Sequence, residues 1–342
     1  MSLKTFRYSY EFPLESGKSL PELQIGYHTY GRMNEDGSNV VWICHALTAN
    51  SEVEDWWYGL FGEGKVLDPN KYFIVCANML GSCYGSTGPT SINPQTDEPY
   101  FRDFPMITVR DMVNAHILLR KHLGIEKIYF GGGGSMGCQQ LLEWAIIEPN
   151  LFESIFLVAG NHRHSPWGIA FNESQRLAIE ADSTFGEPHL DAGAKGLKAA
   201  RSIGILSYRH YDAFLQSQQD EDNKIDDFKA SSYQIYQGDK LVKRFDAYSY
   251  WSLSKTMDSH NIARNRGPAE EVLQKVKART LVVSISSDWL FPPSEQRFLH
   301  QHIPNSDYYE IESFYGHDGF LVEFEKINTI VIGFLKSVIV EQ

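Results

Sequence analysis

The chain has 342 residues, of which 42% are hydrophobic and 22% are charged, and its formal net charge is −12 at pH 7. This composition is typical of a globular protein that folds in water. The negative charge, with no block of lysine or arginine, argues against nucleic acid and against an anionic membrane surface as partners. The start of the chain lacks the basic and apolar layout of a signal peptide, and the longest apolar stretch, Ile327–Val340, is too short to span a bilayer. We therefore expect a cytoplasmic protein.

Strand-like apolar segments alternate with helical patterns along most of the chain, which is typical of an α/β fold. Before residue 36 the sequence predicts antiparallel edge strands at Arg7–Phe12 and Leu23–Thr29. Further strands are predicted at Val40–Cys44, Tyr72–Ala77, Lys127–Phe130, Ser154–Val158, Thr280–Ile285 and Tyr308–Ile311. Helices are predicted at Thr108–Leu123, Cys138–Glu148, Glu295–His302 and Phe324–Val340. The alternation predicts a mostly parallel sheet flanked by helices.

The alternation stops between residues 165 and 266. Helical patterns at Phe171–Glu180, Ala192–Leu206 and Asp246–Ser259 replace it, and the acidic stretch Gln216–Asp227 is predicted to be a solvated loop. Because the strand pattern resumes at Thr280, this block is interpreted as an insertion between two consecutive strands. We predict a core of residues 1–164 and 267–342, with residues 165–266 forming an inserted helical lid.

A glycine-rich run follows the predicted strand Lys127–Phe130. Within it, Gly133–Gly137 reads G-x-S-x-G, the pattern of a turn that presents a nucleophilic serine between a strand and a helix. Glycine tolerates the positive φ and the close backbone approach that such a turn requires. The overlapping segment Gly132–Gly137 also satisfies the dinucleotide pattern G-x-G-x-x-G. The local pattern leaves both interpretations open, together with a purely structural turn.

Two later loops favour the nucleophile. Asp288 directly follows the predicted strand Thr280–Ile285, and His317 lies between glycines after the strand Tyr308–Ile311. The chain order Ser, Asp, His is that of α/β-hydrolases, whereas a dinucleotide loop belongs to the first βαβ unit, and here several strands precede it. We therefore predict Ser135 as nucleophile, His317 as general base and Asp288 as the acid that orients it.

The tetrahedral intermediate formed on such a serine needs N–H donors. The backbone N–H of Met136, at the start of the next helix, is one candidate, and that of Leu47, after the strand Val40–Cys44, is the second. His45 is expected to be structural, because His317 fills the role of base. No metal site is predicted. The histidine pairs His162 with His164 and His300 with His302 lack a convincing set of further ligands.

Segments spread over nearly the whole chain together resemble the homoserine O-acetyltransferase family of α/β-hydrolase-fold acyltransferases. The matching stretches are His45–Thr48, Asp55–Trp57, Asn78–Pro94, Asp103–Pro105, Thr108–Val113, Gly133–Gly137, Ile169–Glu173, Ser207–Arg209, Arg244–Asp246, Ser249–Tyr250, Ser287–Pro293 and Gly316–Leu321. Together they are far more specific than the serine motif alone.

The resemblance implies transfer of an acetyl group from acetyl-CoA to the γ-hydroxyl of L-homoserine in methionine biosynthesis, through a covalent acyl-Ser135. Acetyl-CoA is then a co-substrate, and no further cofactor is expected. The resemblance also implies that Arg209 holds the carboxylate of the acceptor and that Asp318 holds its ammonium group. The family typically forms homodimers through the lid helices.

The sequence departs from the family pattern at Cys138, where a second glycine is usual, and at Asn161–Trp167. Both positions lie near the expected path of the acyl group, so succinyl-CoA as donor and serine as acceptor stay open. An esterase or thioesterase on the same scaffold is a further alternative, as is a catalytically silent binding module, because a fold alone does not fix the chemistry.

Overall fold

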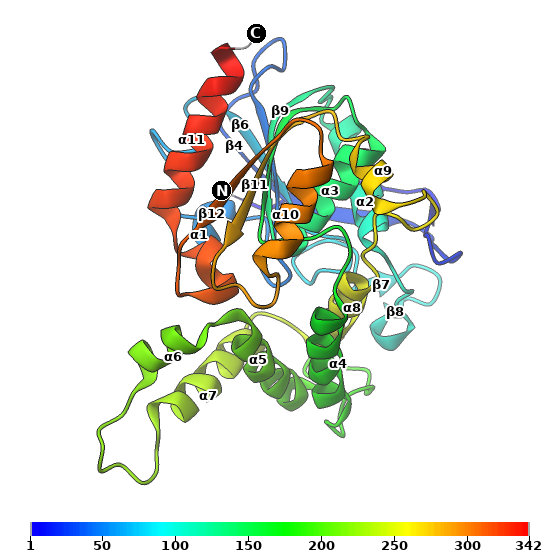
Figure 1. The fold of residues 1–342 in the computed structure, drawn as a ribbon. Helices are drawn as coiled ribbons and strands as arrows, with labels where there is room; N and C mark the ends of the chain where they lie inside the picture. Colours follow the sequence, from blue (N-terminus) through cyan, green and yellow to red (C-terminus); the bar gives the residue numbers. More distant parts are fainter. Residues whose placement is uncertain (1, 341–342) are drawn as a thin grey trace.

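The computed structural model describes residues 2–340, and a single eight-stranded sheet organises them (Figure 1). The sheet order is β1 (Lys4–Tyr8), β4 (Leu23–Tyr30), β6 (Phe73–Ala77), β5 (Val40–Cys44), β9 (Ile128–Gly134), β10 (Phe152–Val158), β11 (Arg279–Ile285) and β12 (Ser306–Ile311). Only the pairs β1–β4 and β4–β6 are antiparallel. Two short hairpins, β2 (Phe12–Pro13) with β3 (Ser19–Leu20) and β7 (Ile92–Asn93) with β8 (Glu98–Pro99), lie outside the sheet. The predicted, mostly parallel sheet is confirmed.

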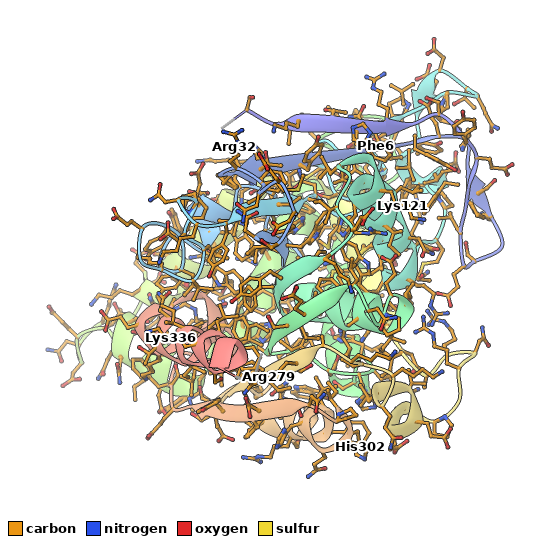
Figure 2. All side chains as sticks on the ribbon, turned by 90° about the horizontal axis from the view of Figure 1, so that it is seen from above. Phe6, Arg32, Lys121, Arg279, His302 and Lys336 are labelled. Carbon is orange, nitrogen blue, oxygen red and sulfur yellow. The ribbon has the colours of Figure 1, made fainter. Side chains whose placement is uncertain are left out.

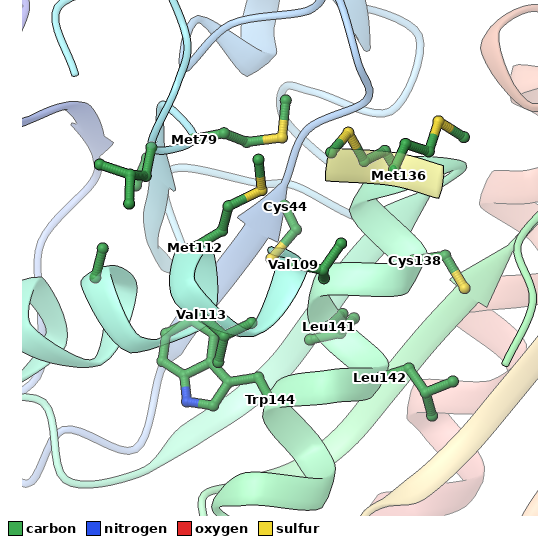
Figure 3. Packing of buried hydrophobic residues seen from close by; sticks show 14 of the residues in the cluster. Cys44, Met79, Val109, Met112, Val113, Met136, Cys138, Leu141, Leu142 and Trp144 are labelled. Atoms are coloured by element: carbon green, nitrogen blue, oxygen red, sulfur yellow. The ribbon is translucent and has the colours of Figure 1, made fainter. Parts of the chain in front are cut away.

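Helices cover both faces of the sheet. The helices α2 (Val109–His122), α3 (Met136–Ile147), α9 (Ala269–Leu273) and α10 (Pro293–His302) pack into one apolar core, and α1 (Val53–Trp56) and α11 (Phe324–Val340) pack into a second one on the other face. Figure 3 shows α2 and α3 meeting through Met112, Val113, Leu141 and Trp144. Because both faces are covered, the central strands are buried along their length, which explains their uninterrupted apolar sequences.

Side chains fill the space between these layers, as the view from above shows (Figure 2). Arg279, at the start of β11, lies over the ring of Phe334 of α11, at 5.2 Å from its centroid. The aliphatic part and the planar head of an arginine can both cover an aromatic surface.

No helix among the described residues is long and apolar enough to cross a membrane.

Strand β9 differs from its prediction. It was expected to end at Phe130 but continues through the four glycines to Gly134, and α3 begins at Met136 rather than at Cys138. A Cβ atom on Gly131 would lie 2.8 Å from Leu141 Cδ1, and one on Gly134 would lie 2.6 Å from Phe320 Cδ2. The glycines therefore serve close packing within the sheet, not only the turn that follows it.

Between β10 and β11 the chain forms the helices α4 (Pro166–Glu180), α5 (Ala194–Tyr208), α6 (Tyr211–Gln218), α7 (Lys229–Val242) and α8 (Ala247–Asp258), followed by the short α9. The α4–α8 segment lies together beyond the carboxyl ends of the strands, below the sheet in Figure 1. Helices α4 and α5 pack together, as do α5 and α7. The sequence had not predicted α6 and α7. The acidic stretch expected as a loop is helical only in its first residues, up to Gln218.

Candidate active site

The serine turn has the strained geometry of a nucleophile elbow. Ser135, between β9 and α3, has φ +56° and ψ −125°, a conformation that non-glycine residues rarely adopt. The residues two positions before and two positions after Ser135 must be glycines. A Cβ atom on Gly133 would lie 2.4 Å from the carbonyl oxygen of Gly137, and one on Gly137 would lie 2.1 Å from that of Cys44. The turn therefore holds Ser135 at the carboxyl edge of the sheet.

The structure brings the three residues of the predicted triad together. Ser135 Oγ lies 2.8 Å from His317 Nε2, and His317 Nδ1 lies 2.7 Å from Asp288 Oδ2. The other oxygen of Asp288 accepts hydrogen bonds from the backbone N–H groups of Leu290 and Phe291. The exposed fractions of Ser135, His317 and Asp288 are 6%, 4% and 2%. A carboxylate at Nδ1 places the ring proton there, so Nε2 is free to accept the serine proton.

Aromatic rings and backbone hold the imidazole of His317. The ring of Phe291 stacks on it at a centroid distance of 5.0 Å, and the edge of Phe320 meets it at 5.3 Å. The preceding Gly316 has φ +71°, and a Cβ atom there would lie 2.7 Å from the backbone nitrogen of His210 and 2.9 Å from the carbonyl oxygen of Tyr208. The loop that carries the base is thus in direct backbone contact with the end of α5.

Of the two expected N–H donors, one follows Ser135 in the chain and the other belongs to a residue that lines the same cavity. Met136 is the first residue of α3, and Leu47 lines the cavity into which Ser135 opens. The close approach of Gly137 to the backbone of Cys44 and His45 brings the β5 loop against the start of α3. His45 is buried and within hydrogen-bond distance of the Ala46 carbonyl and the Met79 N–H, and burial lowers its pKa to about 4. These contacts fit the structural role expected for His45.

The expected substrate residues lie at one side of the cavity. Asp318 lines the cavity, and its Oδ2 accepts a hydrogen bond of 2.7 Å from Arg209 Nε. Arg209 itself is not among the residues that line the cavity, whereas Arg201 is. The guanidinium of Arg201 lies over the ring of Tyr208, and its Nε is buried without a hydrogen-bond partner among the described residues. Sequence reasoning missed Arg201, although it lies seven residues before Tyr208 and thus on the same face of α5.

The cavity is small and mixed in character. Its volume is about 80 Å³, and apolar walls come from Leu47, Met257, Leu290 and Phe320. Polar groups of Ser135, Arg201, His317 and Asp318 enter it from different elements. The arrangement joins a hydroxyl within hydrogen-bond distance of an imidazole with one cation and one carboxylate in the same cavity. Such a site suits covalent acyl chemistry on a small zwitterionic molecule.

Of the positions at which the sequence departs from the family pattern, Cys138, Asn161 and His164 are buried, whereas Arg163, Pro166 and Trp167 are exposed. Cys138 is fully buried, burial raises its pKa, and its Sγ occupies the space that a Cβ atom on Gly160 would need. His164 lines the cavity and is hydrogen-bonded to Asn172. No cluster of three or more His, Cys, Asp or Glu side chains arranged to hold a metal ion occurs within residues 2–340.

The sequence of this chain is similar to the sequences of known proteins over nearly its full length. A model of the alpha/beta hydrolase fold family matches residues 39–324. A homoserine O-acetyltransferase of Cyclobacterium marinum is 50% identical over 334 residues, which cover 98% of this chain and 95% of that protein. One from Chlorobium chlorochromatii is 44% identical, with 95% and 93% covered. The chain belongs to the homoserine O-acetyltransferase family. The fold class and the resemblance found in the sequence are thereby confirmed.

Solved structures of two kinds of enzyme resemble this member of the family closely. The crystal structure of a homoserine O-acetyltransferase from Bacillus anthracis has a TM-score of 0.89 at 26% identity, and the alignment covers 98% of both chains. That of esterase E22 has the same TM-score of 0.89 at 25% identity, covering 98% of this chain and 99% of the esterase. Overall shape therefore does not separate transfer to an alcohol from transfer to water.

Proposed function

We propose that this protein is a homoserine O-acetyltransferase, which moves an acetyl group from acetyl-CoA to the hydroxyl of L-homoserine through a covalent acetyl-Ser135. The observation that carries the proposal is a buried Ser135–His317–Asp288 relay that opens into a cavity bearing one cation and one carboxylate. The identity of 50% to a homoserine O-acetyltransferase over nearly the full length supports the same activity.

In the first half-reaction, His317 takes the proton of Ser135 while Oγ attacks the thioester carbonyl. The backbone N–H groups of Leu47 and Met136 are the proposed donors to the oxyanion, and the N-terminal end of α3 favours negative charge there. His317 then gives its proton to the departing thiolate, and CoA leaves. Asp288 stays ionised throughout and stabilises the imidazolium.

In the second half-reaction, His317 takes the proton of the acceptor hydroxyl while its oxygen attacks the acetyl-serine. The bond between the acetyl carbon and Ser135 Oγ then breaks, and His317 returns the proton to Oγ. We assign the carboxylate of homoserine to Arg201, because Arg201 lines the cavity, and its ammonium group to Asp318. Arg209, which the family resemblance had suggested for the carboxylate, is paired with Asp318 and would orient it. Holding the acceptor in this way raises its effective concentration far above that of competing water.

The charge of the cavity favours acetyl over succinyl as the acyl group. Arg201 is the only arginine or lysine that lines the cavity within the described chain. A succinyl group would add a second carboxylate, and a single cation cannot pair with two.

An esterase is the second candidate, because esterase E22 matches this fold with a TM-score of 0.89. The test is the release of CoA from acetyl-CoA by the purified protein, with and without L-homoserine. We expect release to depend on homoserine and O-acetylhomoserine to be formed in equal amount. Release at the same rate without homoserine, or fast hydrolysis of p-nitrophenyl acetate with no transfer, would favour the esterase. Assays with succinyl-CoA in place of acetyl-CoA test the choice of acyl donor, and assays with L-serine in place of L-homoserine test the choice of acceptor.

We also propose that the protein forms homodimers through α6 and α7. These helices extend away from the rest of the molecule (Figure 1). Large apolar side chains are exposed on them and on the loop between them. They are Tyr211, Leu215, Ile225, Phe228, Ile235 and Tyr236, and Ile225 is 93% exposed. A monomer rarely exposes so many apolar side chains close together, so they mark an interaction surface.

The dimer is tested by light scattering after size exclusion. We expect the wild-type chain to elute as a dimer and the double variant Ile235→Glu, Tyr236→Glu to elute as a monomer. The matched control is Leu177→Glu, on the exposed surface of α4 outside this surface. A wild-type monomer at micromolar concentration would contradict the proposal.

We also propose that the protein is cytoplasmic. Its four unpaired cysteines support a reducing compartment.

A further inference from the structure

One buried donor beside the triad has no partner. His164, in the turn between β10 and α4, is 2% exposed and lines the same cavity as Ser135 and His317. Its ring lies 5.6 Å from that of Phe291, which stacks on His317. Its Nδ1 has no hydrogen-bond partner among residues 2–340. Buried polar atoms without partners are rare and costly in folded proteins.

The surroundings of His164 fix which ring nitrogen carries the proton. Asn172 Nδ2 lies 2.8 Å from Asp258 Oδ1 and 3.2 Å from His164 Nε2. The carboxylate of Asp258 is paired with Arg176, so it can only accept, and the amide of Asn172 must present its nitrogen to it. The second hydrogen of that nitrogen is then donated to His164 Nε2, which at 3.2 Å is closer than the other available acceptor, the carbonyl oxygen of Ser254 at 3.5 Å. Nε2 of His164 is therefore an acceptor, and its ring proton is on Nδ1.

The ring of His164 is also neutral and fixed in place. Burial lowers its pKa to about 3, so the ring carries a single N–H at neutral pH. A Cβ atom on Gly168 of α4 would lie 2.5 Å from His164 Cε1 and Nε2, which means that the helix backbone packs against this edge of the ring. The unpartnered Nδ1–H thus cannot be satisfied by turning the ring over without losing the contact with Asn172.

We propose that the Nδ1–H of His164 donates a hydrogen bond to an oxygen of a bound substrate, so that His164 is a substrate-binding residue of this enzyme. This proposal rests on the proposed transferase function. The oxygen belongs either to the carboxylate of homoserine or to a carbonyl of the acyl-CoA. The ammonium group of homoserine is excluded as the partner, because an N–H can be satisfied only by an acceptor.

Two variants separate the two ring nitrogens. The amide of asparagine can take the place of Nδ1, whereas that of glutamine takes the place of Nε2. His164→Asn therefore keeps the proposed donor and loses the contact with Asn172, and His164→Gln does the reverse. Because the reaction passes through acetyl-Ser135, kcat/KM for each substrate reports its own half-reaction. Thermal melting of both variants shows whether they fold.

We expect His164→Gln to lower kcat/KM for one substrate by about tenfold, and His164→Asn to change it by about threefold or less. A loss confined to homoserine assigns the oxygen to its carboxylate, and a loss confined to acetyl-CoA assigns it to the donor. Equal losses in both variants, or no loss in His164→Gln, would overturn the proposal. In that case the Nδ1–H of His164 would donate to a trapped water, or the ring of His164 would contribute only to packing.

A spectroscopic readout does not depend on turnover. In protein labelled with ¹⁵N-histidine, the signals absent from His164→Asn belong to His164. We expect its Nδ1 to be protonated and to shift when L-homoserine or acetyl-CoA is added to the Ser135→Ala variant. A proton on Nε2, or no shift with either substrate, would overturn the inference. If the wild-type protein released CoA independently of homoserine, the proposed function would fail, whereas the tautomer of His164 would still be tested.

Discussion

The carboxyl edge of the sheet and the α4–α8 segment contribute to the cavity in different ways. At the sheet edge every polar atom of the triad already has its partner, from Ser135 Oγ to the backbone N–H groups that hold Asp288. On the other side, Arg201 Nε in α5 and His164 Nδ1 just before α4 are buried without partners. The first region is prepared for a reaction that is the same for every acyl group. If a bound substrate satisfies the donors of the second region, as we propose, that region sets selectivity.

The largest expected effect is at the sheet edge. Ser135→Ala removes the group that forms the covalent intermediate, and kcat for acetyl transfer should fall by about 10⁶-fold. Homoserine-dependent release of CoA measures this loss. A melting temperature close to that of the wild-type protein shows that the fold is kept. Residual activity above about one per cent would mean that the sheet edge does not supply the nucleophile.

A second change tests how tightly that edge is packed. Gly137→Ala places a Cβ atom 2.1 Å from the carbonyl oxygen of Cys44, so it should lower the free energy of unfolding by about 3 kcal/mol or more and abolish activity. Gly333→Ala is the matched control, because a Cβ atom there meets nothing within 4 Å on α11. That variant should gain about 0.5–1 kcal/mol. Urea unfolding compares the two, and similar stabilities would contradict the packing argument.

The α4–α8 segment is tested with a change at α5. Arg201→Met should raise KM for homoserine roughly ten- to a hundredfold, because a charged hydrogen-bond partner is lost, and should leave kcat/KM for acetyl-CoA nearly unchanged. Arg209→Met removes a cation that does not line the cavity and should have the smaller effect. If Arg209→Met raises KM more than Arg201→Met does, the assignment taken from the family resemblance is the correct one.

The smallest expected effect concerns the free energy of unfolding at acidic pH and its dependence on the buried residue His116. His116 is fully buried between Trp42 and Trp144, and burial lowers its pKa to about 3. Below an unfolded pKa of about 6.5 the unfolded chain binds a proton that the folded chain does not, so stability is lost as the pH falls. His116→Phe should remove about 2 kcal/mol of this loss at pH 5 and nothing at pH 8. Urea unfolding at both pH values measures it, and equal changes at both would contradict it.

The sequence predicts the carboxyl edge of the sheet better than it predicts the α4–α8 segment. The positions of Ser135, Asp288 and His317 could be predicted because each lies in a turn or loop that follows a strand, and parallel strands bring their carboxyl ends to one edge of the sheet. The predicted end of β9 was wrong, since glycine has little preference for strands. Pairing of the four glycines with β10 and β5, together with the packing of Leu141 and Phe320, continues the strand to Gly134.

The α4–α8 segment gave weaker signals. Helix α7 carries Ile235 and Tyr236 on an exposed surface, so its pattern lacks the clear polar face by which a surface helix is recognised. Arg201 could not be separated from other arginines of the segment until α5 was placed beside the cavity. The donor on His164 depends on the partners of Asn172 and Asp258, which no spacing in the sequence reveals.

The contact of Gly316 with the backbone of Tyr208 and His210 joins the loop that carries His317 to the end of α5. A movement of α5 large enough to admit solvent to the cavity would also remove the backbone contact that supports the loop carrying His317. The conformation most accessible to bulk water is then the one in which proton transfer is least well aligned. An acetylated serine would be shielded from wasteful hydrolysis even while the entrance stands open.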